Sequence, residues 1–425
     1  MGAGKEAFFS GLLSGKVGID RIKAFDPSAF SSQVGGEAPV MSMNQVVPKA
    51  HRKATKLMAR DIELAVIAAD GAVRDAGLST KGTCPEGGQV NIDPTRSGVN
   101  VGAGLICCDL VELGSAAEKA VEGGKFSYAK WGREGMEALT PLWLLKYLPN
   151  MLSCHISIIH DLQGPSNSIT CADASGLLAV GEAYRTIARG RAEVMIAGGA
   201  ESKINAMGLL RQCLLGLAST HYNDRPTEAC RPFDRDADGL VVGEGAGIVV
   251  LEELEHARRR GARIYGELRG FSASNTFCTN IVEPEADGEG ISIALAQAAK
   301  EAGADWNEVG FLVAHGLAAP ANDRAEAAGI GRVLGARAKT MPIVATKSRI
   351  GNCGAGAGAI DLVTAALALE AGRIPGNVNC PNARAEYGLN LAGAEGMERN
   401  KNFAAVCCHT FGGQTAAMLI GRTVE

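Results

Sequence analysis

The residues best placed to do chemistry lie in the segment GPSNSITCADASGLLAVGEAYRTIARG, residues 164–190. Its start has the pattern of a strand and its second half that of a buried helix, so Ala172 and Asp173 fall at a sharp turn between them. Unpaired amides and the helix dipole favour a negative charge at such a turn. Enzymes place nucleophiles there because the same field lowers the pKa of a thiol. On local physics alone, Asp173 is interpreted as a cap of the helix.

Further polar residues follow short apolar runs in the second half of the chain. His315 ends the run VGFLVAHG, Lys347 lies in PIVATKS, and Asn352 opens the glycine-rich segment NCGAGAGA. That segment has no GK[ST] ending and no trailing acidic residue at the dinucleotide-binding spacing, so a nucleotide loop is not predicted.

The elements that must position these residues alternate between strands and helices, which favours an α/β fold with a largely parallel sheet. No Pro/Ser-rich linker separates the two halves, 1–261 and 262–425, and we expect them to pack as one unit. Strands are expected at 97–105, 164–170, 192–200, 246–254, 263–274, 309–316, 342–348 and 403–411, helices at 59–77, 174–190, 289–303 and 357–372, and loop or cap insertions at 115–150 and 205–235.

Composition limits the class of function. A net charge of -4 over 425 residues argues against nucleic acid as a partner. The 12 cysteines form no CxxC pair and no Cys/His cluster at metal spacing, so neither a metal nor another cofactor is predicted, and a reducing compartment is expected. With no signal peptide and no span of about 18 apolar residues, we expect a cytoplasmic protein without a membrane partner.

Together the motifs resemble the β-ketoacyl-ACP synthases of type II fatty-acid synthesis and their polyketide relatives, in the thiolase-like superfamily of condensing enzymes. In the segment that begins at Gly164-Pro165, the family's Thr-Ala-Cys falls on Cys171-Ala172-Asp173, and Ser175-Gly176 also matches. Asp173 therefore stands where the nucleophilic cysteine is expected. The block CRPFDRDADGLVVGEGAGIVVLEELEHARRRGARIYGEL, residues 230–268, resembles the family nearly residue for residue.

The resemblance also implies roles for residues in the second half. His315 keeps the histidine of an HGT-like motif, and Lys347 keeps the lysine of a motif whose second catalytic histidine is here Asn352. The segment HTFGGQT resembles a gating loop, with Phe411 at the gate and Thr410 in place of a glycine. The resemblance further implies that His409 lies at the gate, that Asp361 pairs with Lys347, and that Glu326 supports the site.

For the fold, the resemblance implies a thiolase-like α/β architecture in which two pseudo-duplicated halves form a layered αβαβα core. Family members open with a buried hydrophobic strand ahead of the segment that here reads GKEAFFSGLLSGKVGI, and that strand is missing from this sequence.

For function, the resemblance implies an acyl carrier protein as a partner and an acyl thioester as a substrate. A carboxylate at position 173 cannot hold a growing chain, because its attack on a thioester would give a mixed anhydride that hydrolyses readily. We therefore expect a non-condensing subunit, similar to a chain-length factor, in a heterodimer with an active ketosynthase or in a homodimer. Two alternatives remain. In the first, His315 and Asn352 carry out either decarboxylation of malonyl-carrier protein or condensation without a covalent intermediate. In the second, condensation proceeds through Cys171, which is otherwise interpreted as a small buried residue on the strand.

Overall fold

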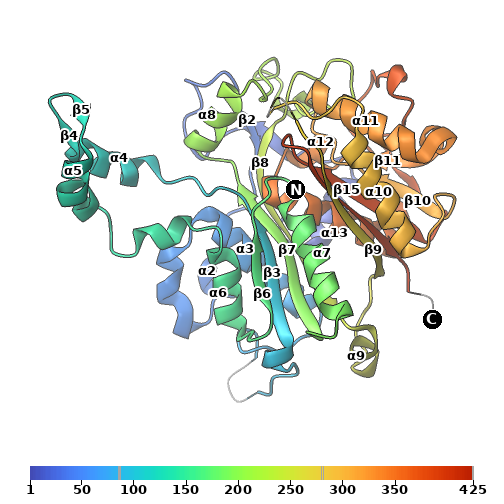
Figure 1. Ribbon diagram of the computed structural model, residues 1–425, viewed down its shortest axis with the longest axis horizontal. Helices are drawn as coiled ribbons and strands as arrows, with labels where there is room; N and C mark the ends of the chain where they lie inside the picture. The colour runs from blue at the N-terminus through green and yellow to red at the C-terminus, as the bar shows by residue number, and fades with distance from the viewer. Residues whose placement is uncertain (85–87, 279, 281, 424–425) are drawn as a thin grey trace.

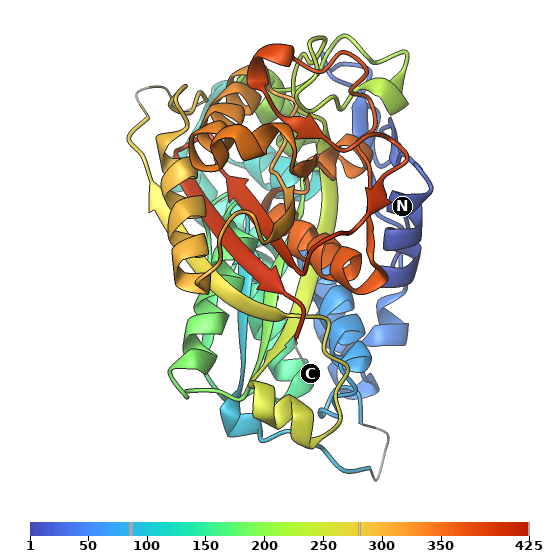
Figure 2. The same ribbon diagram turned by 90° about the vertical axis from the view of Figure 1, so that its right-hand side faces the viewer.

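Two six-stranded sheets form the centre of the computed structural model, which describes residues 1–84, 88–278, 280 and 282–423 (Figures 1 and 2). In the first sheet, β7 pairs in parallel with β3 and antiparallel with β8. Both β3 and β7 are buried along their whole length, as expected for apolar strands that are covered on both faces. The strand order is β1 (Ile19–Arg21), β2 (Val34–Gly36), β8 (Val242–Glu252), β7 (Val194–Ser202), β3 (Ser97–Ala103) and β6 (Ser166–Ile169).

The second sheet repeats the core of the first. In each sheet three parallel strands are followed by one antiparallel strand: β6, β3, β7 and β8 in the first, β11, β10, β15 and β16 in the second. This repetition confirms the two pseudo-duplicated halves. The strand order is β13 (Asn390–Leu391), β11 (Pro342–Val344), β10 (Val309–Val313), β15 (Phe403–His409), β16 (Gln414–Gly421) and β9 (Glu267–Asn275). The sequence patterns did not predict β16, which follows the gating loop directly.

Helices complete the layers and confirm the αβαβα arrangement. The outer face of the first sheet carries α3 (Arg60–Asp75) and α6 (Met151–His160), and that of the second carries α10 (Glu289–Ala302) and α11 (Pro320–Leu334). Between the sheets lie α7 (Ser175–Ala188) and α13 (Ala357–Ala371), whose apolar residues form the central core. All four helices expected from the sequence are present.

The two predicted insertions contain short helices. The first, called the arm below (residues 110–147), projects from the body of the molecule at the left of Figure 1. It comprises α4 (Leu110–Lys119), β4 (Val121–Glu122), β5 (Lys125–Phe126), α5 (Tyr128–Lys130), η3 (Trp131–Gly135), η4 (Met136–Ala138) and η5 (Trp143–Tyr147). The second contains α8 (Ala206–Leu214) and η6 (Pro226–Glu228).

The remaining elements are short. They are α1 (Lys5–Leu13), α2 (Met43–Val46), η1 (Lys49–Leu57), η2 (Pro94–Arg96), α9 (Leu254–Arg259), η7 (Gly335–Lys339), α12 (Lys347–Ile350), η8 (Gly354–Gly356), β12 (Arg373–Ile374), η9 (Ala385–Tyr387) and β14 (Met397–Glu398). The expectation that no span of about 18 apolar residues occurs is wrong, because within the described residues one helical segment, Gly354–Ala371, is long and apolar enough to cross a membrane. It is 78% buried inside the protein, which is the position of a core helix.

Candidate active site

Asp173 lies in the turn that joins β6 to α7. Ala172 has a φ of 43°, a left-handed conformation that is strained for a residue with a Cβ. The Ser175 hydroxyl holds the turn, because it donates to the Ala172 carbonyl at 2.6 Å and accepts from the Cys171 amide at 2.7 Å. The sharp turn expected between strand and helix is therefore confirmed.

The interpretation of Asp173 as a helix cap is wrong. The N-cap residue of α7 is Ala174, and no side chain makes a capping hydrogen bond there. The Asp173 side chain is only 2% exposed, and its Oδ1 accepts no hydrogen bond from any described residue. The carboxylate instead faces a cation, the ammonium of Lys203, whose Nζ lies 3.5 Å from Oδ1.

Lys203 is a site residue that the sequence analysis missed. It directly follows β7, and its Nζ also lies 3.6 Å from Oε1 of Glu201. Burial lowers the pKa of Lys203, but the carboxylates of Asp173 and Glu201 outweigh burial and raise that pKa above its ordinary value. Lys203 therefore stays an ammonium between two acids. The available signal was its position: a charged residue at the carboxyl end of a fully buried strand needs a partner.

Glu201 connects this ion pair to the glycine-rich loop. Its Oε2 accepts a hydrogen bond from the Ala355 amide at 2.7 Å. A Cβ at Gly354 would lie 2.0 Å from the same oxygen and 2.9 Å from Nζ of Lys203, so only glycine fits there. Asp61 on α3 lies behind Glu201: burial, and then the charge of Glu201, raises the pKa of Asp61 to about 7.

The backbone around His315 is held by acids of α11. The two oxygens of Glu326 accept from the amides of His315 and Gly316, both at 2.7 Å, and Asp323 accepts from the two amides that follow. Ala318 in this loop has a φ of 64°, a second strained position. The supporting role assigned to Glu326 thus has a specific form: it fixes the loop that carries His315.

Lys347 supports His315 from the other side. Its Nζ donates to the His315 carbonyl at 2.7 Å and lies 3.4 Å from Oδ2 of Asp361, which is the pairing expected from the sequence. Burial lowers the pKa of Lys347, but Asp361 reverses this and raises it overall. Burial, and then the Lys347 charge, holds the pKa of His315 well below its usual range, so the imidazole is neutral.

Cys408 at the end of β15 joins Asp173 to His315. Its Sγ lies 3.1 Å from the Asp173 carbonyl oxygen and 3.3 Å from Nδ1 of His315. Burial raises the pKa of the Cys408 thiol well above its ordinary value, so it keeps its one proton. When that proton is donated to the Asp173 carbonyl, Nδ1 of His315 is the protonated nitrogen and donates to Sγ. When it is donated to Nδ1, the His315 proton is on Nε2, which has no hydrogen-bond partner among the described residues.

The loop between β15 and β16, which the family resemblance assigns as a gate, is tied by hydrogen bonds of its own. The Thr410 hydroxyl donates to Oε1 of Gln414 at 2.6 Å and accepts from the Gly412 amide at 3.1 Å. Phe411 is half-buried against the apolar cluster that includes Ile204 and Leu317. This loop is therefore tied to itself by the side chain that replaces the glycine expected at position 410.

His409 contacts His315, whereas Asn352 contacts the glycine-rich loop. The rings of His409 and His315 are 4.6 Å apart, and Nε2 of His409 is 3.7 Å from Oε2 of Glu326. Asn352 is buried, and its Oδ1 accepts from the Gly354 amide at 3.1 Å, next to the Lys203 ammonium. The structure thus links Asn352 to the Asp173 side of the site through the glycine-rich loop.

Cys171 differs from its interpretation as a small buried residue on a strand. It lies two residues beyond the end of β6, and its side chain is half-buried in the turn. The turn begins there because the strained Ala172 cannot continue the strand. Burial, and then the charge of Asp173, raises the pKa of the Cys171 thiol, so the thiolate is disfavoured.

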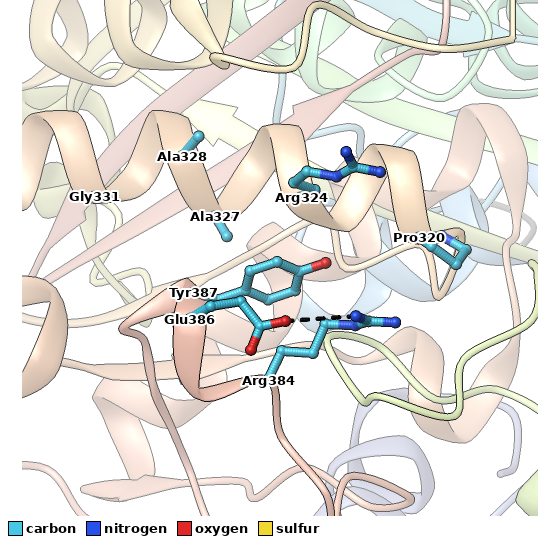
Figure 3. Close-up of a pocket in the computed structure, with 8 residues that line it drawn as sticks. All are labelled: Pro320, Arg324, Ala327, Ala328, Gly331, Arg384, Glu386 and Tyr387. Atoms are coloured by element: carbon cyan, nitrogen blue, oxygen red, sulfur yellow. Dashed lines mark hydrogen bonds and ion pairs between the residues drawn. The ribbon is translucent and has the colours of Figure 1, made fainter.

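A separate surface pocket of about 540 Å³ opens between α11 and η9 (Figure 3). Arg324 on α11 and Arg384 line it, but the Arg384 guanidinium is paired with Glu386. None of the residues assigned to the site lines this pocket. One face of α11 thus lines this pocket, whereas Glu326 on another face accepts a hydrogen bond from the His315 amide.

The matches to known proteins cover almost the whole chain. The sequence profile of the β-ketoacyl synthase N-terminal domain matches residues 1–257, and that of the C-terminal domain matches residues 265–381. The chain is 33% identical to a 3-oxoacyl-[acyl-carrier-protein] synthase 2 of Rhizobium meliloti over 99% of this chain and 96% of that protein. It is 35% identical to the mitochondrial 3-oxoacyl-[acyl-carrier-protein] synthase of Arabidopsis thaliana, over 90% of this chain and 82% of that one.

Solved structures give the same result. The ishigamide ketosynthase/chain length factor matches with a TM-score of 0.83 and 27% identity, over 100% of this chain and 96% of that one. A type II polyketide synthase acyl-carrier protein in complex with its ketosynthase, bound to the hexaketide, matches with a TM-score of 0.84 and 25% identity, over 99% and 96%. The thiolase-like fold expected from the sequence is confirmed.

Proposed function

Since this chain belongs to the β-ketoacyl synthase family, we propose that it acts on acyl-carrier-protein thioesters as a non-condensing subunit paired with an active ketosynthase. The observation that carries the proposal is the buried ion pair of Asp173 and Lys203 at the elbow between β6 and α7. In the register expected from the family resemblance, Gly164 to Gly176, Asp173 falls at the position of the nucleophile. The fatty-acid or polyketide context belongs to the proposal, and it is supported by a relative named 3-oxoacyl-[acyl-carrier-protein] synthase 2 and by a solved type II polyketide synthase complex.

The chemistry at the elbow supports loss of chain loading. Condensation needs a thiolate, which attacks a thioester and later leaves. Asp173 would form a mixed anhydride instead, and Cys171 has its thiol pKa raised by burial and by Asp173. Intact-mass analysis after incubation with acyl-carrier protein tests this. We expect no stable acyl adduct, and an adduct that disappears in Cys171→Ala would overturn the proposal in favour of condensation through Cys171.

Two exposed features on one side of the molecule support a partner subunit. The edge strand β6 pairs only with β3 among the described strands, and an open edge invites pairing with another chain. The arm projects on the same side (Figure 1), and large apolar side chains on it are exposed. Val111 is 81% exposed, Tyr128 85% and Leu142 61%, which is typical of a surface that another subunit covers.

Co-expression distinguishes a heterodimer from a homodimer. We expect the chain to purify with a cysteine-bearing homologue, and Val111→Glu with Tyr128→Glu in the arm to abolish that complex while the thermal melting of the isolated chain is kept. A matched control is Val40→Glu, because Val40 is 91% exposed and lies outside the arm and β6. Tight homodimers that ignore every ketosynthase partner would overturn the heterodimer.

A second candidate, decarboxylation of malonyl-carrier protein, is favoured by one specific observation. Lys203 offsets the charge of Asp173, which reduces the repulsion between Asp173 and a malonyl carboxylate. When the Cys408 thiol donates to Nδ1, the neutral His315 has its proton on Nε2 and can donate it to the thioester carbonyl, which is the role of an oxyanion-hole donor. The test is release of carbon dioxide from malonyl-carrier protein, which should be lost in His315→Phe. Release equal to the background without protein would remove this candidate.

The cytoplasmic location expected from the sequence stays part of the proposal. The synthases to which the chain is similar include bacterial ones and a mitochondrial one. The division of the chain at residues 261 and 262 is likewise a proposal. It is supported by chain order, because the strands of the first sheet all precede α9 in the sequence and those of the second all follow it.

A further inference from the structure

The centre of the site holds buried polar atoms that no described residue satisfies. Oδ1 of Asp173 and Nε2 of His315 both lack a hydrogen-bond partner, although their side chains are almost fully buried. Leaving such an atom unpaired destabilises the folded protein, so two of them on neighbouring residues mark a position for a ligand or a water molecule. Sγ of Cys408 contacts the backbone carbonyl oxygen of Asp173 and Nδ1 of His315, so the two residues lie on either side of one thiol.

The two atoms differ in what they can bind. A carboxylate oxygen only accepts hydrogen bonds, whereas Nε2 of His315 donates when the Cys408 thiol serves Nδ1. A water molecule against Asp173 and a carbonyl oxygen against His315 would satisfy both. That arrangement places an acceptor for the water proton beside a donor for an oxyanion, which is what addition of water to a thioester requires.

We propose that this site hydrolyses carrier-protein thioesters, with Asp173 as the general base. Asp173 takes a proton from water as the hydroxide oxygen bonds to the thioester carbon, and the carbonyl oxygen becomes an oxyanion that accepts from Nε2 of His315. Collapse of this intermediate re-forms the carbonyl and breaks the C–S bond. The thiolate leaves and receives the proton held by Asp173, so the products are a carboxylic acid and a free thiol.

Lys203 acts in this step as a positioning residue. Its ammonium lies 3.5 Å from Oδ1 of Asp173 and 3.6 Å from Glu201, and it makes no hydrogen bond to either. It holds the carboxylate at the elbow by charge while Oδ1 keeps its capacity to accept from water. Its side chain is 13% exposed, so it is also the member of this ion pair that reaches toward solvent.

This inference takes its substrate class from the proposed function but not the subunit role. The probe is hexanoyl-pantetheine, with the purified full chain and release of free pantetheine followed by mass spectrometry. We expect turnover above buffer, a loss of about 100-fold or more in Asp173→Asn, and a loss in His315→Phe. The matched control is Asp287→Asn, because Asp287 is 54% exposed, pairs with Arg332 and is not one of the residues assigned to the site.

Isotope labelling tests whether Asp173 acts as a nucleophile whose mixed anhydride is opened by water at the Asp173 carbonyl. In a single turnover in H₂¹⁸O, general-base hydrolysis places ¹⁸O in hexanoic acid and none in the peptide that contains Asp173. Label in that peptide would overturn the assignment as a base, because it reports a mixed anhydride. Lys203→Met should lower the rate and shift its pH dependence, whereas a structural role alone would leave the pH profile unchanged.

Turnover equal to buffer, or unchanged in Asp173→Asn, would overturn the hydrolysis. The two proposals fail separately. A chain that purifies with a ketosynthase and releases no pantetheine keeps the subunit role and loses the hydrolysis. A chain that hydrolyses the probe and binds no ketosynthase loses the subunit role alone.

Discussion

Nζ of Lys203 lies 3.5 Å from Oδ1 of Asp173, at a place where the ends of neighbouring strands meet. Asp173 follows β6 and Lys203 follows β7, and both strands pair in parallel with β3. Because parallel strands end at the same edge of a sheet, residues 30 positions apart in the chain come into contact. The charge at the elbow is therefore balanced by a residue from another strand and not by the helix that begins beside it.

Removing the cation should destabilise the protein strongly. Lys203→Met leaves Asp173 and Glu201 buried without their shared positive charge, and breaking such a pair costs about 3 kcal/mol. Adding Asp173→Asn removes one of the two stranded charges, so the double variant should recover part of that loss. Urea denaturation of the single and double variants measures both effects.

An exposed ion pair provides the control for this measurement. Arg332 and Asp287 are 47% and 54% exposed and lie 3.0 Å apart, so Arg332→Met should cost no more than about 1 kcal/mol. If Lys203→Met were no more destabilising than Arg332→Met, the buried ion pair would not contribute to stability.

A thiol at the elbow should be reactive. In Asp173→Cys, the Lys203 ammonium lies beside the new side chain and lowers its pKa, which raises the fraction of thiolate at neutral pH. We expect iodoacetamide to modify residue 173 about tenfold faster than Cys171 and acyl-carrier protein to load it. Peptide mass spectrometry locates the adduct. Adding Lys203→Met should slow the modification of residue 173, and equal rates with and without Lys203 would show that the ammonium does not act on it.

The sequence predicted the parts of the site that depend on local pattern. The turn before α7 follows from a strand pattern that changes to a helix pattern, and His315 and Lys347 follow apolar strand runs. The pairing of Lys347 with Asp361 came from the family resemblance, and the distance of 3.4 Å confirms it.

The residues that the sequence did not reveal act through tertiary contacts. Lys203 is one charged residue at a strand end, and nothing near it in the chain indicates which acid it meets. Cys408 reads as a small buried residue of an apolar strand, and it is one, but its position also brings Sγ between Asp173 and His315. Helix capping by Asp173 was a local expectation, and the buried cation outweighs it.

The loop after β15 should open more often when the side-chain hydrogen bonds of Thr410 are removed. The Thr410 hydroxyl accepts from the Gly412 amide and donates to Gln414, so Thr410→Gly removes both bonds. Losing about 1 kcal/mol should speed hydrogen exchange of the Gly412 amide about fivefold. Thr410→Ser is the matched control, because it keeps the hydroxyl, and it should exchange like the original protein. Equal exchange in the glycine and serine variants would show that these bonds do not hold the loop.

Asp61 should make the protein less stable as the pH rises from about 4 to 7. Its pKa is raised to about 7 in the folded protein by burial and by Glu201, whereas an unfolded Asp titrates near 3.9. Between these values the folded state binds a proton that the unfolded state lacks, so the free energy of unfolding falls as pH increases, by up to about 1.4 kcal/mol per pH unit. Above pH 7 both states have lost the proton, and the contribution becomes constant.

Asp61→Asn removes this titration and should flatten the decline between pH 5 and 6.5, which urea denaturation at several pH values measures. The substitution keeps the size of the side chain and an oxygen that can accept from the Ser202 amide, as Oδ1 of Asp61 does at 3.0 Å. The asparagine variant should therefore gain stability relative to the original protein as pH rises. Asp287→Asn is the control, since the pKa of the Asp287 carboxyl is lowered, by the hydrogen bond from Arg332 first, and its titration ends below this range. Parallel curves for Asp61→Asn and the original protein would show that Asp61 does not hold a proton at neutral pH.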